Sequence, residues 1–287
     1  MKVARVSLTA VLCVIVSAPA ALAASGSQGT VAPHYYVSLG DSLAEGDQLP
    51  GMSFDEGYAD QLYASLRQDD PTLQLVKLGC GGESTTSMLV GSLHQAEGSS
   101  CGTPRFYRKT YPVGGTQLSQ AVSFLHAHAS FVSLMTIDIG GNDVGACIAQ
   151  LDASCLASAS ATMTSNLTTI VAALREAAGP VVPIVGMNYY DPFLVYWFSD
   201  AGAASVTVQM VTAFNADLGT VYGDASIPVA DVETAFFTTV PFTTTVGEIP
   251  LSVAAICEWT WMCSNFDLHP NTTGYGVIAQ AFEVVLT

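Results

Sequence analysis

Charged residues are scarce in this 287-residue chain, and basic ones are the scarcest. Only 11% of the residues are charged, with 8 Lys and Arg against 24 Asp and Glu, so the formal net charge is −16. A chain this acidic repels phosphate backbones, which argues against a nucleic-acid partner. Half of the residues are hydrophobic, which excludes a disordered protein and is sufficient for one large core.

After its first residues the chain also lacks any long apolar run. Lys2 and Arg5 precede an apolar stretch over residues 6–16, and Ala-Leu-Ala at 21–23 has the small-x-small pattern of a cleavage site. This predicts a secretory signal peptide over residues 1–23. A membrane anchor is the alternative, but the stretch is too short to span a bilayer comfortably. We therefore expect a secreted protein with no transmembrane segment in its mature chain.

Cysteines are few but suggestive in number. Of the 7 cysteines, Cys13 lies in the predicted signal peptide, and the others are Cys80, Cys101, Cys147, Cys155, Cys257 and Cys263. An even number in an exported chain predicts disulfides, although several pairings are possible. Neighbours in sequence suggest Cys80–Cys101, Cys147–Cys155 and Cys257–Cys263. A zinc site is the alternative, but no C-x-x-C or paired Cys/His spacing supports it.

Short apolar runs alternate with helical patterns along the rest of the chain. The runs typical of strands are 35–39, 73–78, 131–139, 181–185 and 227–232, and the helical patterns are 58–66, 117–127, 161–177 and 277–285. This alternation predicts a parallel sheet covered by helices on both faces. We expect a single domain over residues 35–287, preceded by a flexible mature N-terminus over residues 24–34.

Residues suited to chemistry follow the predicted strands. The sequences are GDSL at 40–43, GCGGES at 79–84 and GGND at 140–143, and DLHP follows near the C-terminus at 267–270. In open parallel sheets, ligands bind beyond the carboxyl ends of the strands. These four segments are therefore expected to meet at one edge of the sheet.

Together these segments hold the groups that an acyl-transfer site needs. A serine hydroxyl such as that of Ser42 requires a base, and a histidine such as His269 has a suitable pKa near neutral pH. Attack on an ester creates an oxyanion, which preplaced N–H donors stabilise. The backbone N–H groups of Ser42 and Gly82 and the side-chain amide of Asn142 are candidates for these donors.

The ordered set GDSL, Gly82, G-x-N-D and His-Pro resembles the SGNH hydrolase superfamily, which includes the GDSL esterases and lipases. The resemblance extends from Tyr35 to the last helix and is closest to secreted bacterial members with three disulfides. It implies a flavodoxin-like, three-layer α/β/α sandwich and a secreted esterase or lipase. Ser42 would be the nucleophile, His269 the base, and Ser42, Gly82 and Asn142 the oxyanion hole. Asp41 and Asp143 would bond neighbouring loops.

The resemblance also implies no metal and no organic cofactor. We expect a small-molecule or lipid ester as substrate, no nucleic acid, and a monomer. A carbohydrate acetylesterase using the same site is one alternative. A catalytically inactive binding protein of the same fold is another.

One position departs from the family pattern. The family usually places the triad aspartate three residues before the histidine, where this chain has Phe266. Asp267 is one residue closer, and in an extended loop its side chain would point away from the imidazole. We therefore expect a main-chain carbonyl, from the 259–264 loop, to hold the ring. Asp267 is the alternative.

Two further segments have competing interpretations. GSSCG at 98–102 matches the nucleophile elbow of α/β-hydrolases, but no strand pattern precedes it, so we do not expect it to be catalytic. Aromatic residues at 189–198 follow the fourth predicted strand. They are expected either to form an apolar wall for an acyl chain or to pack a helix on the core.

Overall fold

A computed structural model of the chain describes residues 34–49, 54–91 and 115–287. The predicted signal peptide, the rest of the predicted N-terminal segment up to residue 33 and the GSSCG sequence lie outside the described residues. The strands of the central sheet are β1 (Tyr35–Gly40), β2 (Gln74–Lys77), β3 (Val132–Asp138), β4 (Ile184–Met187) and β5 (Val229–Ala230).

All pairings in this 5-stranded sheet are parallel, and the strand order is β2-β1-β3-β4-β5. The predicted α/β fold with a central parallel sheet is therefore confirmed. The chain's winding direction changes between β1 and β3, which is where doubly wound sheets bind ligands. The register pairs Gly40 with Asp138, so β1 and β3 end side by side.

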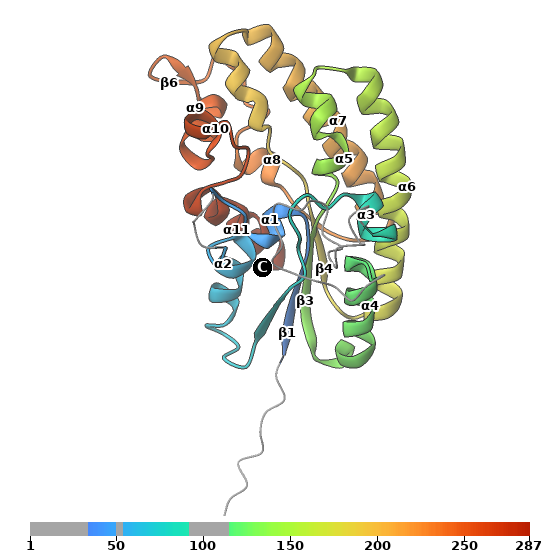
Figure 1. Cartoon of the computed structure of the whole chain (residues 1–287). Helices are drawn as coiled ribbons and strands as arrows, with labels where there is room; N and C mark the ends of the chain where they lie inside the picture. The colour runs from blue at the N-terminus through green and yellow to red at the C-terminus, as the bar shows by residue number, and fades with distance from the viewer. Residues whose placement is uncertain (1–33, 50–53, 92–114) are drawn as a thin grey trace, which may run out of the picture. The chain divides into compact units, whose positions relative to one another are not determined.

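The helices cover both faces of the sheet (Figure 1). They are α1 (Ser42–Glu45), α2 (Tyr58–Leu66), α3 (Thr85–Val90), α4 (Gln117–His128), α5 (Gly141–Ala149), α6 (Ala153–Ala178), α7 (Ala201–Asp224), α8 (Val232–Ala235), α9 (Leu251–Trp259), α10 (Met262–Asn265) and α11 (Thr272–Leu286). Two 3₁₀ turns, η2 (Ala129–Phe131) and η3 (Pro192–Phe198), and a hairpin of β6 (Thr245–Val246) and β7 (Ile249–Pro250) complete the described fold.

Aromatic packing joins the helices on each side of the sheet. On one side α2 packs against α11, where the rings of Tyr58 and Phe282 stack with centroids 4.9 Å apart. On the other side lie α4, α6 and α7, and Tyr222 of α7 packs on Gly186 of β4. A methyl group at Gly186 would lie 2.7 Å from the Tyr222 ring, so β4 needs a glycine there.

The expected elements are present with shifted ends. The helix predicted over 161–177 begins at Ala153, because the Asp152 carboxylate caps it by accepting bonds from the amides of Ser154 and Cys155. The strand predicted over 181–185 lies at 184–187, because the side chain of Arg175 binds the carbonyls of Gly179 and Val182 and holds that segment in a turn. No helix was predicted for 201–224, where α7 forms.

Cys147 is bonded to Cys155, and Cys257 to Cys263, as expected. The third expected pair, Cys80–Cys101, includes a residue outside the described part of the chain. None of the described helices combines the length and the apolar character that a membrane span requires.

Gly40 is the residue on which the junction of β1 and β3 depends. Its φ is +140°, and a methyl group there would collide with the main-chain oxygen and the carboxyl group of Asp138. We expect Gly40→Ala to lower the free energy of unfolding by about 3 kcal/mol, from backbone strain and overpacking together. Gly219 of α7 has an ordinary helical backbone and open space around it, so Gly219→Ala should not lower the free energy of unfolding. Equal losses in urea denaturation would contradict the assigned clash.

Candidate active site

The first turn of α1 holds Ser42 at the carboxyl end of β1. Asp41 caps this turn, and its Oδ1 accepts a 2.9 Å bond from the amide of Leu43. The next amide, that of Ala44, donates to Oδ2 of Asp138, 3.2 Å away. Within the described part of the chain, the Ser42 amide has no acceptor. The turn therefore leaves one backbone donor free beside the Ser42 hydroxyl.

Two buried carboxyl groups lie beneath this turn. Asp138 is fully buried and accepts a 2.6 Å bond from the Tyr58 hydroxyl. Asp41 accepts a 3.0 Å bond from the hydroxyl of Tyr189. Burial, followed by the charge of Asp41, raises the pKa of Asp138 well above that of an exposed aspartate. Burial also raises the pKa of Asp41. Asp41 and Asp138 together therefore keep a bound proton up to a higher pH than two exposed carboxyl groups would.

His269 reaches this turn from the other end of the chain. Its Nε2 lies 2.9 Å from the Ser42 Oγ, and its Nδ1 lies 2.6 Å from Oδ1 of Asp267. When Nδ1 carries the proton and donates it to the carboxylate, Nε2 is left to accept from the hydroxyl. Ser42, His269 and Asp267 thus form one hydrogen-bonded chain.

The contact with Asp267 differs from our main expectation, which placed a main-chain carbonyl on the imidazole. That expectation assumed an extended loop, but Phe266 has a left-handed backbone with φ of 54° and ends α10. Oδ1 of Asp267 also accepts a 2.9 Å bond from the backbone amide of His269, as in an Asx turn. The turn folds the carboxylate back onto the ring, so a spacing of two residues suffices. The Phe266 side chain is 86% exposed.

Hydrogen bonds to the main chain hold the His269 loop in place. The Tyr190 hydroxyl donates to the carbonyl of Leu268 over 2.6 Å, and the amide of Trp261 donates to the carbonyl of His269 over 3.0 Å. These two bonds hold the main chain at residues 268 and 269, and with it the position of the imidazole ring. This explains how a residue so distant in sequence keeps a fixed position beside Ser42.

The electrostatics of His269 favour the protonated ring. Burial lowers its pKa, but the hydrogen bond and charge of Asp267, helped by Asp47 and Asp41, outweigh this effect. The pKa of His269 is therefore raised above the ordinary value of histidine. A carboxylate at Nδ1 also stabilises the imidazolium that forms when the ring takes a proton.

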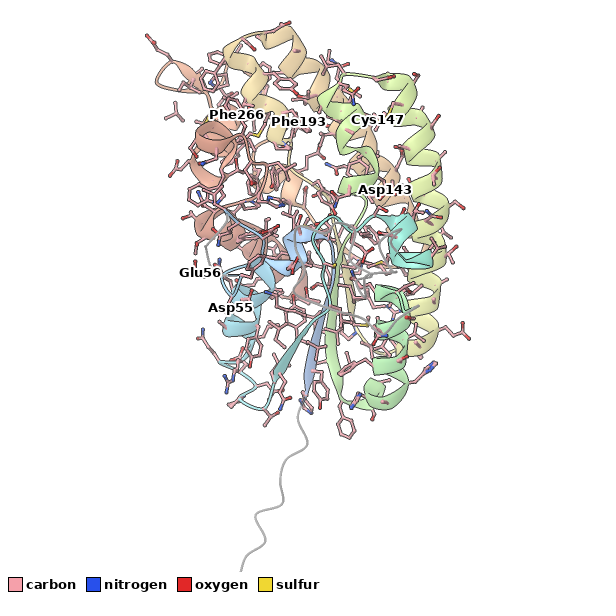
Figure 2. All side chains as sticks on the ribbon, in the orientation of Figure 1. Asp55, Glu56, Asp143, Cys147, Phe193 and Phe266 are labelled. Atoms are coloured by element: carbon pink, nitrogen blue, oxygen red, sulfur yellow. A yellow bond between two sulfur atoms is a disulfide. The ribbon has the colours of Figure 1, made fainter. Side chains whose placement is uncertain are left out.

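Asn142 contacts the loop after β2, in which Gly82 lies. The Asn142 Nδ2 donates a 2.9 Å bond to the carbonyl of Glu83, which uses one of its two hydrogens. Within the described residues, the Gly82 amide has no acceptor. Asp143 fixes the same loop by accepting from the amide and the hydroxyl of Thr85, at 2.9 and 2.6 Å. Figure 2 shows Asp143 where the start of α5 meets α3.

Gln117 and Glu83 support the site and were not predicted. The Gln117 side chain accepts from the amide of Gly40 at 2.7 Å and donates to its carbonyl at 2.9 Å. The same amide nitrogen lies 3.1 Å from Oε2 of Glu83. Burial raises the pKa of Glu83 to about 7. Only the tertiary contacts distinguish Gln117, since nothing in its local pattern differs from an ordinary helix start.

A cavity of about 450 Å³ opens beside Ser42. Leu43, Asn142 and several residues of α5 line it on one side, and Tyr189, Tyr190, Pro192 and Phe193 line it on another. The aromatic segment was expected either to form an apolar wall or to pack on the core. It does both, because Tyr189 and Tyr190 are buried while Phe193 faces the cavity.

A parallel sheet with this site at its switch point defines an α/β ester hydrolase. The sequence matches the model of the GDSL-like lipase/acylhydrolase family over residues 38–277, and the chain belongs to this family. Its members are carboxylic ester hydrolases, so the protein is an enzyme of that kind. No curated protein matches the sequence at a significant level.

Solved structures show the same fold. A lipase from a goat rumen metagenome is 16% identical with a TM-score of 0.57, and the match covers 88% of this chain and 96% of that one. An extracellular lipase from Streptomyces rimosus is 16% identical with a TM-score of 0.53, with coverage of 88% and 99%. The acetylxylan esterase Axe2 from Geobacillus stearothermophilus is 13% identical with a TM-score of 0.53, with coverage of 88% and 93%.

The raised pKa of His269 makes a prediction about pH. If His269 acts as a base it must be neutral, so kcat/KM should fall with decreasing pH through an inflection above the ordinary value of about 6.5. Asp267→Asn removes the charge that raises this pKa. The inflection should move to lower pH, and the plateau of kcat/KM should fall by about 10³-fold.

A second aspartate–histidine pair provides the control. Asp70 lies 2.7 Å from Nδ1 of His34, which precedes β1 and so lies at the end of that strand opposite Ser42. Asp70→Asn should leave the pH profile of ester hydrolysis unchanged. A profile that is identical in the wild type and in Asp267→Asn would show that Asp267 does not set the pKa of the base.

Proposed function

We propose that the protein hydrolyses carboxylic esters through an acyl-enzyme formed on Ser42, with His269 as general base. The 2.9 Å contact between the Ser42 Oγ and the His269 Nε2 carries this proposal. A hydroxyl bonded to a neutral imidazole can lose its proton as it attacks, which is the requirement for a serine nucleophile. Asp267 would hold the tautomer and stabilise the imidazolium.

The proposed reaction has two halves. Ser42 Oγ attacks the ester carbonyl carbon while its proton passes to Nε2 of His269. The alcohol then leaves with that proton, and the acyl group stays on Ser42. A water molecule attacks the acyl-enzyme with His269 again as base, and the acid is released as the Ser42 hydroxyl regains its proton.

The negative charge of each tetrahedral intermediate would fall on the former carbonyl oxygen. The free amides of Ser42 and Gly82 and the second hydrogen of Asn142 Nδ2 are proposed as its donors. Fixed donors of this kind stabilise an oxyanion more than water does, because they need no reorganisation during the reaction. The bond that Asn142 donates to Glu83 and the bond that Asp143 accepts from the Thr85 amide support this arrangement.

The cavity favours an apolar acyl group over an acetylated carbohydrate. Most of its lining consists of apolar side chains, and the hydroxyls of Tyr189 and Tyr190 are already bonded to Asp41 and to the Leu268 carbonyl. A sugar would find few partners there. Two of the similar structures are lipases and one is an acetylxylan esterase, so the fold does not decide between these substrates.

We also propose that the protein is secreted and acts as a monomer. The predicted signal peptide and the disulfides Cys147–Cys155 and Cys257–Cys263 support export.

The complete chain of contacts among Ser42, His269 and Asp267 argues against an inactive binding protein of the same fold.

Ser42→Ala tests the nucleophile. We expect turnover of a short p-nitrophenyl ester to fall by about 10⁴- to 10⁶-fold, because no other hydroxyl is bonded to His269 in the described structure. A fluorophosphonate should label the wild type at Ser42 and leave Ser42→Ala unlabelled. Ser154→Ala, which removes an exposed hydroxyl of α6, is the control and should behave as the wild type. Labelling at another serine would refute the proposal.

Asn142→Ala tests the oxyanion hole. Loss of one donor should lower kcat by about 10²- to 10³-fold with little change in KM, since the donor acts on the charged intermediate. Asn166 makes a matched control, because its amide bonds the hydroxyls of Thr85 and Thr86 at the same loop without lining the cavity. If Asn166→Ala lowers kcat as much as Asn142→Ala does, both losses come from a displaced loop, and Asn142 is not a donor to the oxyanion.

A further inference from the structure

The cavity beside Ser42 extends along two turns of α5. Asn142 lies at the end near Ser42, Gly145 follows one turn later, and Ala149 lies near the other end of the helix. From Gly141 to Ala149 the helix rises by about 12 Å, so the cavity follows α5 well beyond the room an acetyl group needs. Figure 2 shows Phe193 at the height of Cys147 of α5, above Asp143 at the start of that helix.

A hydrogen bond joins the two walls near the far end of the cavity. The Tyr196 hydroxyl donates a 3.0 Å bond to the carbonyl of Ala149, which ties η3 to the end of α5. The rings of Phe193 and Tyr196 lie 5.8 Å apart on the same turn. Between Asn142 and this end, the lining side chains offer no hydrogen-bonding group that is not already bonded. The distal part of the cavity thus suits methylene groups.

Gly145 faces this space without being required by the packing of the protein. A methyl group at Gly141 would press on the ring of Tyr189 at 2.9 Å, whereas one at Gly145 would meet no atom within 4 Å. Residues four apart lie on the same side of a helix, so Gly145 points to the side of Tyr189, one turn further along. Glycine inside a helix is less stable than alanine. Glycine at position 145 therefore leaves room in the cavity and makes the helix less stable than alanine would.

We propose that Gly145 is the residue that sets the acyl-chain length of the substrate, and that the cavity takes a medium-length acyl chain such as octanoyl. This inference rests on the proposed function, because it places the acyl carbonyl at Ser42. Gly145 lies about 6 Å along the helix from Gly141, so a side chain there divides the cavity. The part near Ser42 would still hold an acetyl group, and the distal methylenes would lose their place.

The test compares p-nitrophenyl acetate, butyrate and octanoate. Each added methylene should raise the wild-type kcat/KM by about threefold, until the cavity is filled. Gly145→Leu should lower the ratio of octanoate to acetate kcat/KM by about 30-fold or more, and Gly145→Ala should lower it by less. Gly219 of α7 is the matched control, since it too is helical with open space around it but lies outside the cavity. Gly219→Leu should keep the wild-type ratio.

Two kinds of failure are distinguishable. A wild type that hydrolyses acetate without preferring octanoate, or a Gly145→Leu variant with an unchanged ratio, overturns this inference and leaves the proposed esterase intact. A wild type that hydrolyses no ester and is not labelled by a fluorophosphonate overturns the esterase. In that case calorimetry with octanoate still tests whether the cavity holds an acyl chain beside Gly145. Octanoate binding to the wild type that Gly145→Leu weakens tenfold or more supports this role. No binding to the wild type, or equal binding to both proteins, refutes it.

Discussion

The binding of the first turn of α1 by two buried carboxyl groups is the constraint on which the site depends. A turn this short leaves its amides without partners in the helix, and Asp41 and Asp138 take those of Leu43 and Ala44. The Ser42 amide is left free for a ligand. Because the amide of Asp41 also bonds the main-chain oxygen of Asp138 at 3.1 Å, the pairing of β1 with β3 sets the position of the serine.

The same two carboxyl groups connect the site to both layers of helices. Tyr58 of α2 donates to Asp138, and Tyr189, which follows β4, donates to Asp41. Burying two carboxyl groups so close together is unfavourable unless their oxygens are bonded and part of their charge is neutralised by a proton. The protein meets this cost with four hydrogen-bond donors: two amides of α1 and the hydroxyls of Tyr58 and Tyr189. The negative environment in turn favours a protonated His269, as its raised pKa indicates.

Helix α5 links chemistry to substrate choice. Its first turn carries Asn142, the proposed donor to the oxyanion, and its later turns form the wall along which an acyl chain would lie. The disulfide Cys147–Cys155 joins this helix to the start of α6, and the bond from Tyr196 to the Ala149 carbonyl joins it to η3. These two bonds hold the last part of α5, and the bonds that Thr85 donates to Asp143 hold its first turn, so Asn142 is kept in place.

The sequence by itself determined the fold class, the family and the residues that meet at the sheet edge. Apolar strand runs that end in glycine and polar residues can be recognised from neighbouring residues alone. Parallel strands then bring their carboxyl ends to one edge of the sheet, whatever the packing of individual side chains. Helix α7 escaped prediction because its glycine, threonine and valine residues have low helix propensity, and burial of Met210 and Phe214 against the core compensates for this. Local pattern does not report such compensation.

Only the tertiary structure decided what holds His269. The left-handed backbone of Phe266 and the Asx turn of Asp267 depend on how α10 ends and on the bond from Tyr190 to Leu268, which joins residues 78 apart. Asp138, Gln117 and Glu83 gained their positions in the site in the same way, through contacts between distant segments. Neighbouring residues determine a strand or a turn, whereas the direction of a side chain within a site depends on everything packed around it.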